Sequence, residues 1–285
     1  METNNLSKYR WVILVALMMI TMMSQVQWLT HAPIARAAEV YYKGRFNPLS
    51  FFNIDFLASS YMILYLVFAI PASYFISTFG IVKGIGLGVL LTVVGASLKG
   101  FSGESFNMVM AGQIILAIAQ PFIINSPTAV AARWFPVQER AMATGLATLA
   151  QYIGILIAMV ITPMLIVSSP ASPDYGNGIG SMLRIYCIIT VVASVTGWIL
   201  LKEKPPTPVS DQNSENISFF KGLKHIFSLR DMWIMILLFT IGLGIFNAVN
   251  SMVDSIAKYI GVDDSNGLIG GLMLIGGIIG AIILP

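Results

Sequence analysis

The sequence predicts an all-α, polytopic membrane protein, and its composition is the first reason. The 285 residues are 56% hydrophobic and only 10% charged, whereas a soluble domain carries about 25% charged residues. The mean hydropathy is +0.81. With 16 basic and 13 acidic residues, the chain could not cover the surface of a water-soluble fold, so a soluble enzyme is excluded. The net charge of +3 is too small to indicate a nucleic-acid partner.

Apolar runs of membrane length are the second reason. About 20 apolar residues at 1.5 Å per residue cross a bilayer as a helix. Such runs cover 11–34, 55–78, 84–101, 107–132, 141–168, 181–201, 232–259 and 267–285. Their length and continuity favour helices over barrel strands, which are short and alternate in polarity. Glycines such as Gly95 in the third run permit close contact between helices.

The first run also has some features of a signal peptide. Lys8 and Arg10 precede it, and Ala35-Arg36-Ala37 after it resembles a signal-peptidase site. The run is longer than a signal core and more spans follow, so we interpret it as an uncleaved first helix.

Basic residues predict the orientation in the membrane. Ten lie on the amino-terminal side of the spans: Lys8, Arg10, Lys83, Arg133, Arg140, Lys202, Lys204, Lys221, Lys224 and Arg230. Six lie on the other side: Arg36, Lys43, Arg45, Lys99, Arg184 and Lys258. This bias predicts a multi-pass protein of the cell membrane with a cytoplasmic N-terminus.

The spans divide unevenly. We expect a six-helix bundle over 1–201, a cytoplasmic linker over 202–230 and the start of a second bundle over 231–285. Transporters are commonly built from repeated halves, so two spans after the linker suggest a fragment of a longer protein. Within the linker, 217–229 fits an amphipathic helix on the inner leaflet. A solvated linker with scattered apolar residues fits equally well.

One loop carries a family resemblance. Residues 131–143 (AARWFPVQERAMA) join the fourth and fifth spans. They resemble the cytoplasmic loop between helices four and five of the major facilitator superfamily. The resemblance implies that fold, here an amino-terminal six-helix bundle plus the first two helices of a second bundle. We expect Arg133, Glu139 and Arg140 to pair there as a cytoplasmic gate.

Shorter motifs are similar to one branch of that superfamily, the feline leukaemia virus subgroup C receptor-related (heme/choline) transporters. They are Gln27-Trp28, Gly112-Gln113 followed by Ala119-Gln120 and Pro127, Gly244-Ile245-Phe246-Asn247, and Ser265-Asn266-Gly267-Leu268-Ile269-Gly270. The resemblance implies a membrane transporter and covers nearly the whole chain, thinly between motifs.

The chain differs from that branch at several positions, and these differences affect what the resemblance implies about the substrate, not about the fold. The branch typically has a Tyr that grips a quaternary amine together with the helix-one Trp, where this chain has Asn247. Its Asn-Gln pair in helix five is Gln151-Tyr152 here. The superfamily loop after helix two is degraded over 73–83. The resemblance therefore implies fold and transport, but neither choline nor heme.

Polar residues inside the spans predict the solute site. Such side chains normally face a cavity or another helix. Asn247, Asn250 and Asp254 share one helical face, as do Thr144, Thr148 and Gln151, and Tyr61 and Tyr65. The expected solute contacts are Gln27, Trp28, Gln120, Gln151, Asn247 and Asn250. The alternatives are hydrogen bonds between helices, notably for Gln113 and Asn125, and an interfacial belt position for Trp28.

Two further residues are candidates for coupling or for a vestibule. A histidine side chain ordinarily titrates near neutral pH, which makes His31 a candidate, with a polar residue at a helix end as the alternative. Asp254 could accept a coupling proton. At 1.5 Å per residue, Asp254 lies about 32 Å beyond Trp233, which favours a solvated vestibule. With one Cys, and with His31 and His225 on opposite sides, we expect no metal site. No cofactor is expected, and no phosphate-binding loop motif occurs.

The sequence thus predicts a transporter that moves a small organic solute by alternating access. Its energy would come from a proton or sodium gradient, or from the solute gradient itself. The oligomeric state stays open. One alternative is a non-transporting receptor-like or structural membrane protein, and another is an organic-anion transporter of the same superfamily. The lack of a basic residue among the expected contacts favours neutral or cationic solutes.

Overall fold

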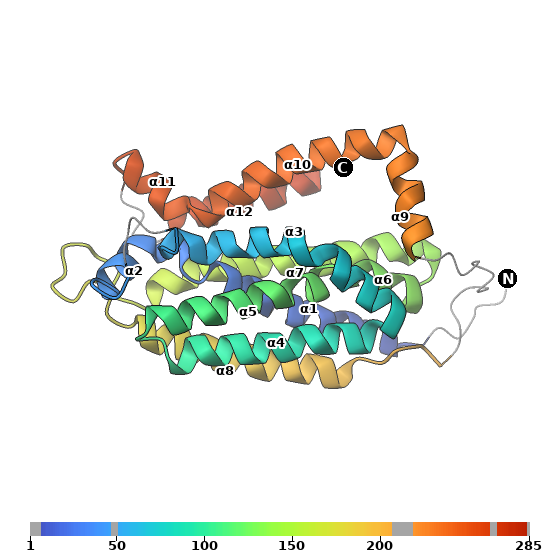
Figure 1. Ribbon diagram of the computed structural model, residues 1–285, viewed down its shortest axis with the longest axis horizontal. Helices are drawn as coiled ribbons and strands as arrows, with labels where there is room; N and C mark the ends of the chain where they lie inside the picture. The colour runs from blue at the N-terminus through green and yellow to red at the C-terminus, as the bar shows by residue number, and fades with distance from the viewer. Residues whose placement is uncertain (1–6, 47–50, 207–218, 263–266, 284–285) are drawn as a thin grey trace.

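A computed structural model describes residues 7–46, 51–206, 219–262 and 267–283. Within these ranges every regular element is a helix, and the long helices run side by side along one axis (Figure 1). The all-α polytopic fold predicted from the sequence is confirmed. One end of the bundle, hereafter the amino-terminal end, holds Tyr9, Trp134 and Leu200; the opposite end holds α2 and α11.

Among the described residues, seven helical segments are long and apolar enough to cross a membrane. Their helices are α1 (Tyr9–Leu29) with η1 (Ala32–Ile34) and α2 (Ala35–Tyr41), α3 (Ile54–Phe79), α4 (Ile81–Phe101), α5 (Phe106–Ile124) with α6 (Ser126–Trp134), α7 (Val137–Met164), α8 (Ile179–Leu200), and α10 (Arg230–Ser251). The predicted eighth span contains the shorter apolar helix α12 (Leu268–Ile283).

Three of the predicted spans are interrupted. Pro33 and Pro127, which lack a backbone N–H, lie just after the breaks that end α1 and α5. The seventh span breaks at Met252, between α10 and α11 (Val253–Tyr259). There, Asn250 and Ser251 donate side-chain hydrogen bonds to the carbonyls four residues earlier, at 2.8 Å each. Such bonds compete with the helix ladder and often accompany a bend.

The core surrounds α1. This helix packs against α7 and α8, and α4 lies between α5 and α8. The best apolar window of the α1 segment is 72% buried, against 11% for α3 and none for α10. Helix α12 packs along α7, and α10 touches α3. The division at 201 and 230 into two bundles and a linker stays a prediction.

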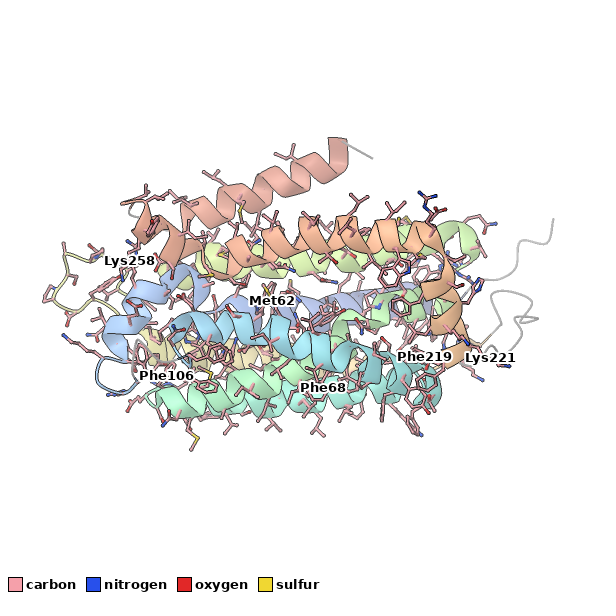
Figure 2. The ribbon with its side chains drawn as sticks, turned by 45° about the horizontal axis from the view of Figure 1, so that its top comes forward. Met62, Phe68, Phe106, Phe219, Lys221 and Lys258 are labelled. Atoms are coloured by element: carbon pink, nitrogen blue, oxygen red, sulfur yellow. The ribbon has the colours of Figure 1, made fainter. Side chains whose placement is uncertain are left out.

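Part of the predicted linker is helical. Helix α9 (Phe219–Ser228) lies at the amino-terminal end and runs across the direction of the long helices (Figure 1). Figure 2 places Phe219 and Lys221 at that end and Lys258 at the opposite one. The helix predicted within 217–229 therefore exists, while residues 217–218 lie outside the described residues. Its position on the inner leaflet stays a prediction.

Glycines bring α4 and α5 into backbone contact. A Cβ built on Gly95 would lie 2.7 Å from the carbonyl oxygen of Gly112, and one on Gly112 would lie 2.6 Å from that of Gly95. Real Cβ atoms do not approach so closely. The close helix contact predicted for Gly95 is confirmed, and it sets the distance between the two helices.

We expect Gly95→Ala to lower the free energy of unfolding by about 1–3 kcal/mol, because overpacking must separate the two backbones. Gly145→Ala is the matched control, since a Cβ on Gly145 in α7 meets nothing within 4 Å. It should be neutral or mildly stabilising. Thermal unfolding in detergent measures both, and equal effects of the two substitutions would contradict the packing argument.

Candidate solute-binding cavity

A cavity of about 520 Å³ lies between α1, α3, α5, α7 and α10. One of its lining residues, Met62, lies midway along the bundle in Figure 2. The polar and aromatic lining residues are Gln25, Trp28, Tyr61, Tyr65, Gln120, Gln151, Tyr152, Phe239, Thr240, Phe246 and Asn247. Of the predicted solute contacts, the structure brings Trp28, Gln120, Gln151 and Asn247 together here.

Trp28 and Tyr61 form an aromatic wall on one side of the cavity. Their rings stack with centroids 6.2 Å apart and an interplanar angle of 24°. The indole Nε1 of Trp28 donates a hydrogen bond of 3.0 Å to the carbonyl of Ala58 in α3. Trp28 is only 5% exposed, so the interfacial-belt interpretation is wrong. Within the described residues, the Tyr61 hydroxyl has no hydrogen-bond partner, which leaves a polar atom at this wall for a ligand.

Amides and rings from α7 and α10 also line the cavity. Gln151 and Asn247 are half-buried. Tyr152 meets Phe246 edge-on, with ring centroids 6.0 Å apart. The cavity thus offers aromatic faces together with neutral hydrogen-bonding groups.

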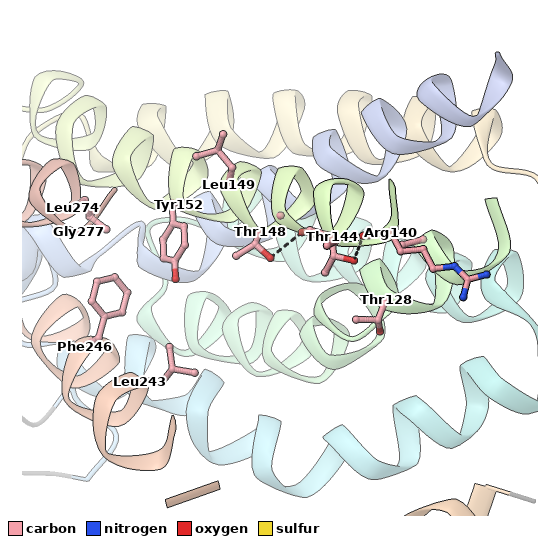
Figure 3. A pocket seen from close by; sticks show the side chains of 13 residues that line it. Thr128, Arg140, Thr144, Thr148, Leu149, Tyr152, Leu243, Phe246, Leu274 and Gly277 are labelled. Carbon is pink, nitrogen blue, oxygen red and sulfur yellow. Dashed lines mark hydrogen bonds between the residues drawn. The ribbon is translucent and has the colours of Figure 1, made fainter. Parts of the chain in front are cut away.

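The hollow continues along α7 toward the amino-terminal end. A larger space of about 1000 Å³ shares Tyr152, Leu243 and Phe246 with the central cavity and reaches Arg140 (Figure 3). Thr144 and Thr148, predicted to share a face with Gln151, line it. Their hydroxyls donate to the carbonyls of Arg140 and Thr144, at 2.9 and 3.0 Å. One helical face therefore carries hydroxyls and an amide from Arg140 to Gln151.

Two predicted contacts lie outside the central cavity. Gln27 is 1% exposed, and its Nε2 donates 2.9 Å to the Thr190 hydroxyl in α8. Successive helical residues point about 100° apart, so Gln27 faces α8 while Gln25, at i−3 from Trp28, faces the cavity. Asn250 is fully buried and donates to the Phe246 carbonyl. The predicted placement of both residues is wrong.

Gln113 and Asn125 make hydrogen bonds between helices, the alternative considered for them. The Asn125 Oδ1 accepts from the Tyr65 hydroxyl at 2.5 Å, and its Nδ2 donates to Ser73 at 2.9 Å. The Gln113 Nε2 donates to the carbonyls of Trp28 and Leu57.

Asp254 is not in a solvated vestibule. Its side chain is 4% exposed and forms an ion pair with Arg36, whose Nε and NH2 both lie 2.6 Å from Oδ1. The depth prediction treated the seventh span as one straight helix, but the break at Met252 turns Asp254 inward toward α2. His31 is likewise buried, at 2% exposure, and within the described residues both its ring nitrogens lack a hydrogen-bond partner.

The three predicted gate residues do not pair with one another. Arg133 forms an ion pair with Glu203, Glu139 pairs with Arg10 at 3.1 Å, and Arg140 donates to the Phe135 carbonyl. Glu203 also accepts hydrogen bonds from the first backbone N–H groups of α4, where a carboxylate is favoured by the helix dipole. Arg133 and Glu139 thus each form an ion pair at the amino-terminal end, with partners outside the predicted set, and the role of the three residues as a cytoplasmic gate stays a prediction.

Polar contacts between the first 206 residues and α11 lie at the opposite end. Besides Arg36–Asp254, Ser255 donates 2.7 Å to Asp55, and Lys258 pairs with Glu39 at 3.2 Å. These contacts fasten α11 to α2 and α3. No sequence pattern predicts these contacts, because the partners are about 200 residues apart.

Lys99 was assigned to the side of the membrane opposite the N-terminus, but it is buried inside α4 at 1% exposure. It is therefore not one of the exposed basic residues on that side of the membrane. The orientation itself stays a prediction.

The fold and the cavity define a class: polytopic α-helical membrane proteins with a polar-lined central cavity. Residues 7–285 match the Major Facilitator Superfamily. The chain therefore belongs to this superfamily of membrane transporters.

Named relatives agree with this assignment. Solute carrier family 49 member A3 of Danio rerio is 28% identical over 96% of this chain and 58% of its own length. The choline/ethanolamine transporter FLVCR1 of Felis catus is 28% identical over 98% of this chain and 51% of its own length. The predicted resemblance to this branch is confirmed. The chain spans about half the length of the curated relatives it matches.

A solved structure has the same fold. A bacterial homologue of the human lysosomal transporter Spinster, described as inward-facing and unoccupied, superposes with a TM-score of 0.65 at 16% identity. The match covers 97% of this chain and 63% of that one.

We expect Asp254→Asn to lower the free energy of unfolding by about 3 kcal/mol, because it removes the buried carboxylate from the ion pair with Arg36. Glu39→Gln is the matched control: its pair with Lys258 joins the same elements but is 43% and 58% exposed, and such pairs contribute about 0–1 kcal/mol. Thermal unfolding in detergent compares them. Equal losses would contradict the importance of burial.

Proposed function

We propose that the protein moves a small organic solute across the membrane by alternating access, with the solute held in the central cavity. The observation that carries the proposal is the meeting of Trp28 and Tyr61 with the amides of Gln120, Gln151 and Asn247 around one space of about 520 Å³. These residues come from helices on both sides of the predicted linker. A solute bound there would contact both halves, as a rocking-bundle cycle requires.

A neutral or cationic solute fits this cavity best. None of the described residues that line it has an acidic or basic side chain. The faces of Trp28 and Tyr61 attract a cation by their ring quadrupoles. Some relatives are named choline/ethanolamine transporters, which supports small amino alcohols as the first solutes to assay. Asn247 supplies an amide where that branch has an aromatic ring, so a more polar headgroup than choline is also favoured.

An organic anion is the second candidate. Arg140 lines the larger hollow beside Thr144 and Thr148. A guanidinium with neighbouring hydroxyls is a common carboxylate site. This assignment would place the anion toward the amino-terminal end rather than against Trp28.

The contacts of α11 would act as the gate at the opposite end. Arg36–Asp254, Asp55–Ser255 and Glu39–Lys258 join α11 to α2 and α3. At the amino-terminal end, the ion pairs Arg10–Glu139 and Arg133–Glu203 stay within the first 206 residues. With a cytoplasmic N-terminus, the described conformation would be closed outside. An ion gradient or the solute gradient would drive the cycle.

Uptake into proteoliposomes tests the solute. We expect labelled choline or ethanolamine to accumulate, and unlabelled 3,3-dimethylbutan-1-ol, the uncharged shape analogue of choline, to compete weakly. Trp28→Ala should reduce uptake about tenfold, since a desolvated cation–π contact contributes about 1–2 kcal/mol. Trp198→Ala, at a 41% exposed position in α8, is the control.

The same assay distinguishes the other candidates. Uptake of a carboxylate that is lost in Arg140→Gln would favour an organic anion as the solute. Binding without uptake of any solute would favour a receptor-like protein.

Cross-linking tests the gate. In a Cys187→Ser background, Asp55→Cys and Ser255→Cys replace two residues in contact between α3 and α11. Joining them should abolish uptake, and a reductant should restore it. Arg10→Cys with Glu139→Cys joins α1 to α7 inside the first bundle and should leave uptake intact. Unimpaired uptake by the cross-linked α3–α11 pair would rule out the proposed movement.

A further inference from the structure

Lys99 is a buried lysine with only uncharged partners among its hydrogen bonds. It lies in α4 with 1% exposure. Its Nζ donates 2.6 Å to the Oε1 of Gln113 and 3.0 Å to the backbone carbonyl of Gln27. No carboxylate within the described residues forms an ion pair with it. Burying an ammonium group costs several kcal/mol unless other groups compensate, so this position requires an explanation.

The end of α1 supplies the compensation. This helix ends at Leu29 and has no basic residue in its last turn. Carbonyls in the last turn of a helix lack N–H partners and carry the negative end of the helix dipole. Lys99 reaches one of them, the carbonyl of Gln27, from the neighbouring helix. The ammonium group therefore acts as the missing cation at the end of α1.

Close packing of α4 and α5 lets Lys99 reach this position. A Cβ on Gly112 would lie 2.9 Å from the Lys99 Cγ and 2.6 Å from the carbonyl oxygen of Gly95. The lysine side chain thus passes over a glycine in α5. Any other residue at 112 would push the side chain or the helix away.

Gln113 extends the same contact to two further backbones. It is fully buried. While its Oε1 accepts from Lys99, its Nε2 donates 3.1 Å to the carbonyl of Trp28 and 2.8 Å to that of Leu57 in α3. Four helices therefore meet at this pair: α4 and α5 supply the side chains, and α1 and α3 supply the carbonyls.

Two of these carbonyls lie at the aromatic wall: one belongs to Trp28, and the other belongs to Leu57, one helical turn before Tyr61. Trp28 itself accepts from Gln113, and Leu57 precedes Ala58, whose carbonyl holds the Trp28 indole. Tyr61, which stacks on Trp28, follows one helical turn after Leu57. The pair thus fixes α1 against α3 at the level where their two rings face the cavity.

We propose that Lys99 and Gln113 are positioning residues that hold the Trp28–Tyr61 wall in place and thereby set the selectivity of the cavity. Neither residue lines the central cavity, so they act through the wall and do not touch the solute. The selectivity part rests on the proposed function. The placement of Trp28 does not, and it is measurable without any solute.

Fluorine NMR of the full chain labelled with 5-fluorotryptophan tests the placement. The chain has five Trp residues, and loss of one resonance in Trp28→Phe assigns that signal. We expect Lys99→Met to shift and broaden the Trp28 resonance, while the resonances of Trp198 and Trp233 stay unchanged. Tyr186→Phe is the control, because it keeps the ring and removes only a buried hydroxyl, which makes a 2.9 Å hydrogen bond to Thr162 in α7. It should leave the Trp28 signal in place.

A folded Lys99→Met protein with an unchanged Trp28 resonance would overturn the proposal. If this variant fails to fold, the double variant Lys99→Met with Gln113→Met is measured instead. It removes donor and acceptor together, which is better tolerated than removing one, and an unchanged Trp28 resonance in it would likewise overturn the proposal.

For choline uptake, Lys99→Met should raise KM about tenfold with Vmax retained, about the effect of one hydrogen bond to a charged group. A shifted Trp28 resonance in a chain that takes up no solute would defeat the proposed function and leave this inference standing.

Discussion

Polar atoms inside a membrane need partners within the protein, because hydrocarbon supplies none. In this bundle that constraint is most demanding where α1 stops at Leu29, short of the far end, and leaves carbonyls of its last turn exposed to an apolar core. Lys99 and Gln113 satisfy the carbonyls of Gln27 and Trp28. The glycines of α4 and α5 are needed to bring them there. The close spacing of α4 and α5 and the placement of the aromatic wall thus both follow from one requirement, which the break in α1 creates.

The same requirement separates structural polar residues from those available to a solute. Gln27, Gln113 and Asn125 each hydrogen-bond to another helix, so they hold helices together. Tyr61 lines the cavity, and among the described residues its buried hydroxyl has no hydrogen-bond partner. Fully paired groups in a membrane bundle contribute little to recognition, whereas an unpaired group at a cavity retains its capacity to bind. The cavity is therefore defined by unsatisfied polar atoms as much as by its volume.

This distinction explains how far the sequence predicted the site. Depth and family motifs correctly brought Trp28, Gln120, Gln151 and Asn247 to one cavity, because a regular helix converts spacing into position. Gln27 was misplaced because adjacent residues on a helix face different neighbours, and only tertiary packing decides which side is the cavity. Asp254 was misplaced by a break that no proline marks. Lys99 was counted among the basic residues on the side opposite the N-terminus, because its partners, a glutamine side chain and a carbonyl, carry no charge that a sequence pattern reveals.

The strength of the contacts at the two ends bears on the proposed cycle. The far end is held by one buried ion pair, Arg36–Asp254, and by the more exposed pair of Glu39 and Lys258. An exposed pair contributes about 0–1 kcal/mol, so the Arg36–Asp254 pair contributes most of the stability of the closed end. Opening would expose both of its charges to water, and their hydration would recover much of that energy. The net difference between closed and open states would then be a few kcal/mol. Differential binding of a solute shifts an equilibrium by about that amount, so contacts of this strength would close the far end without locking it.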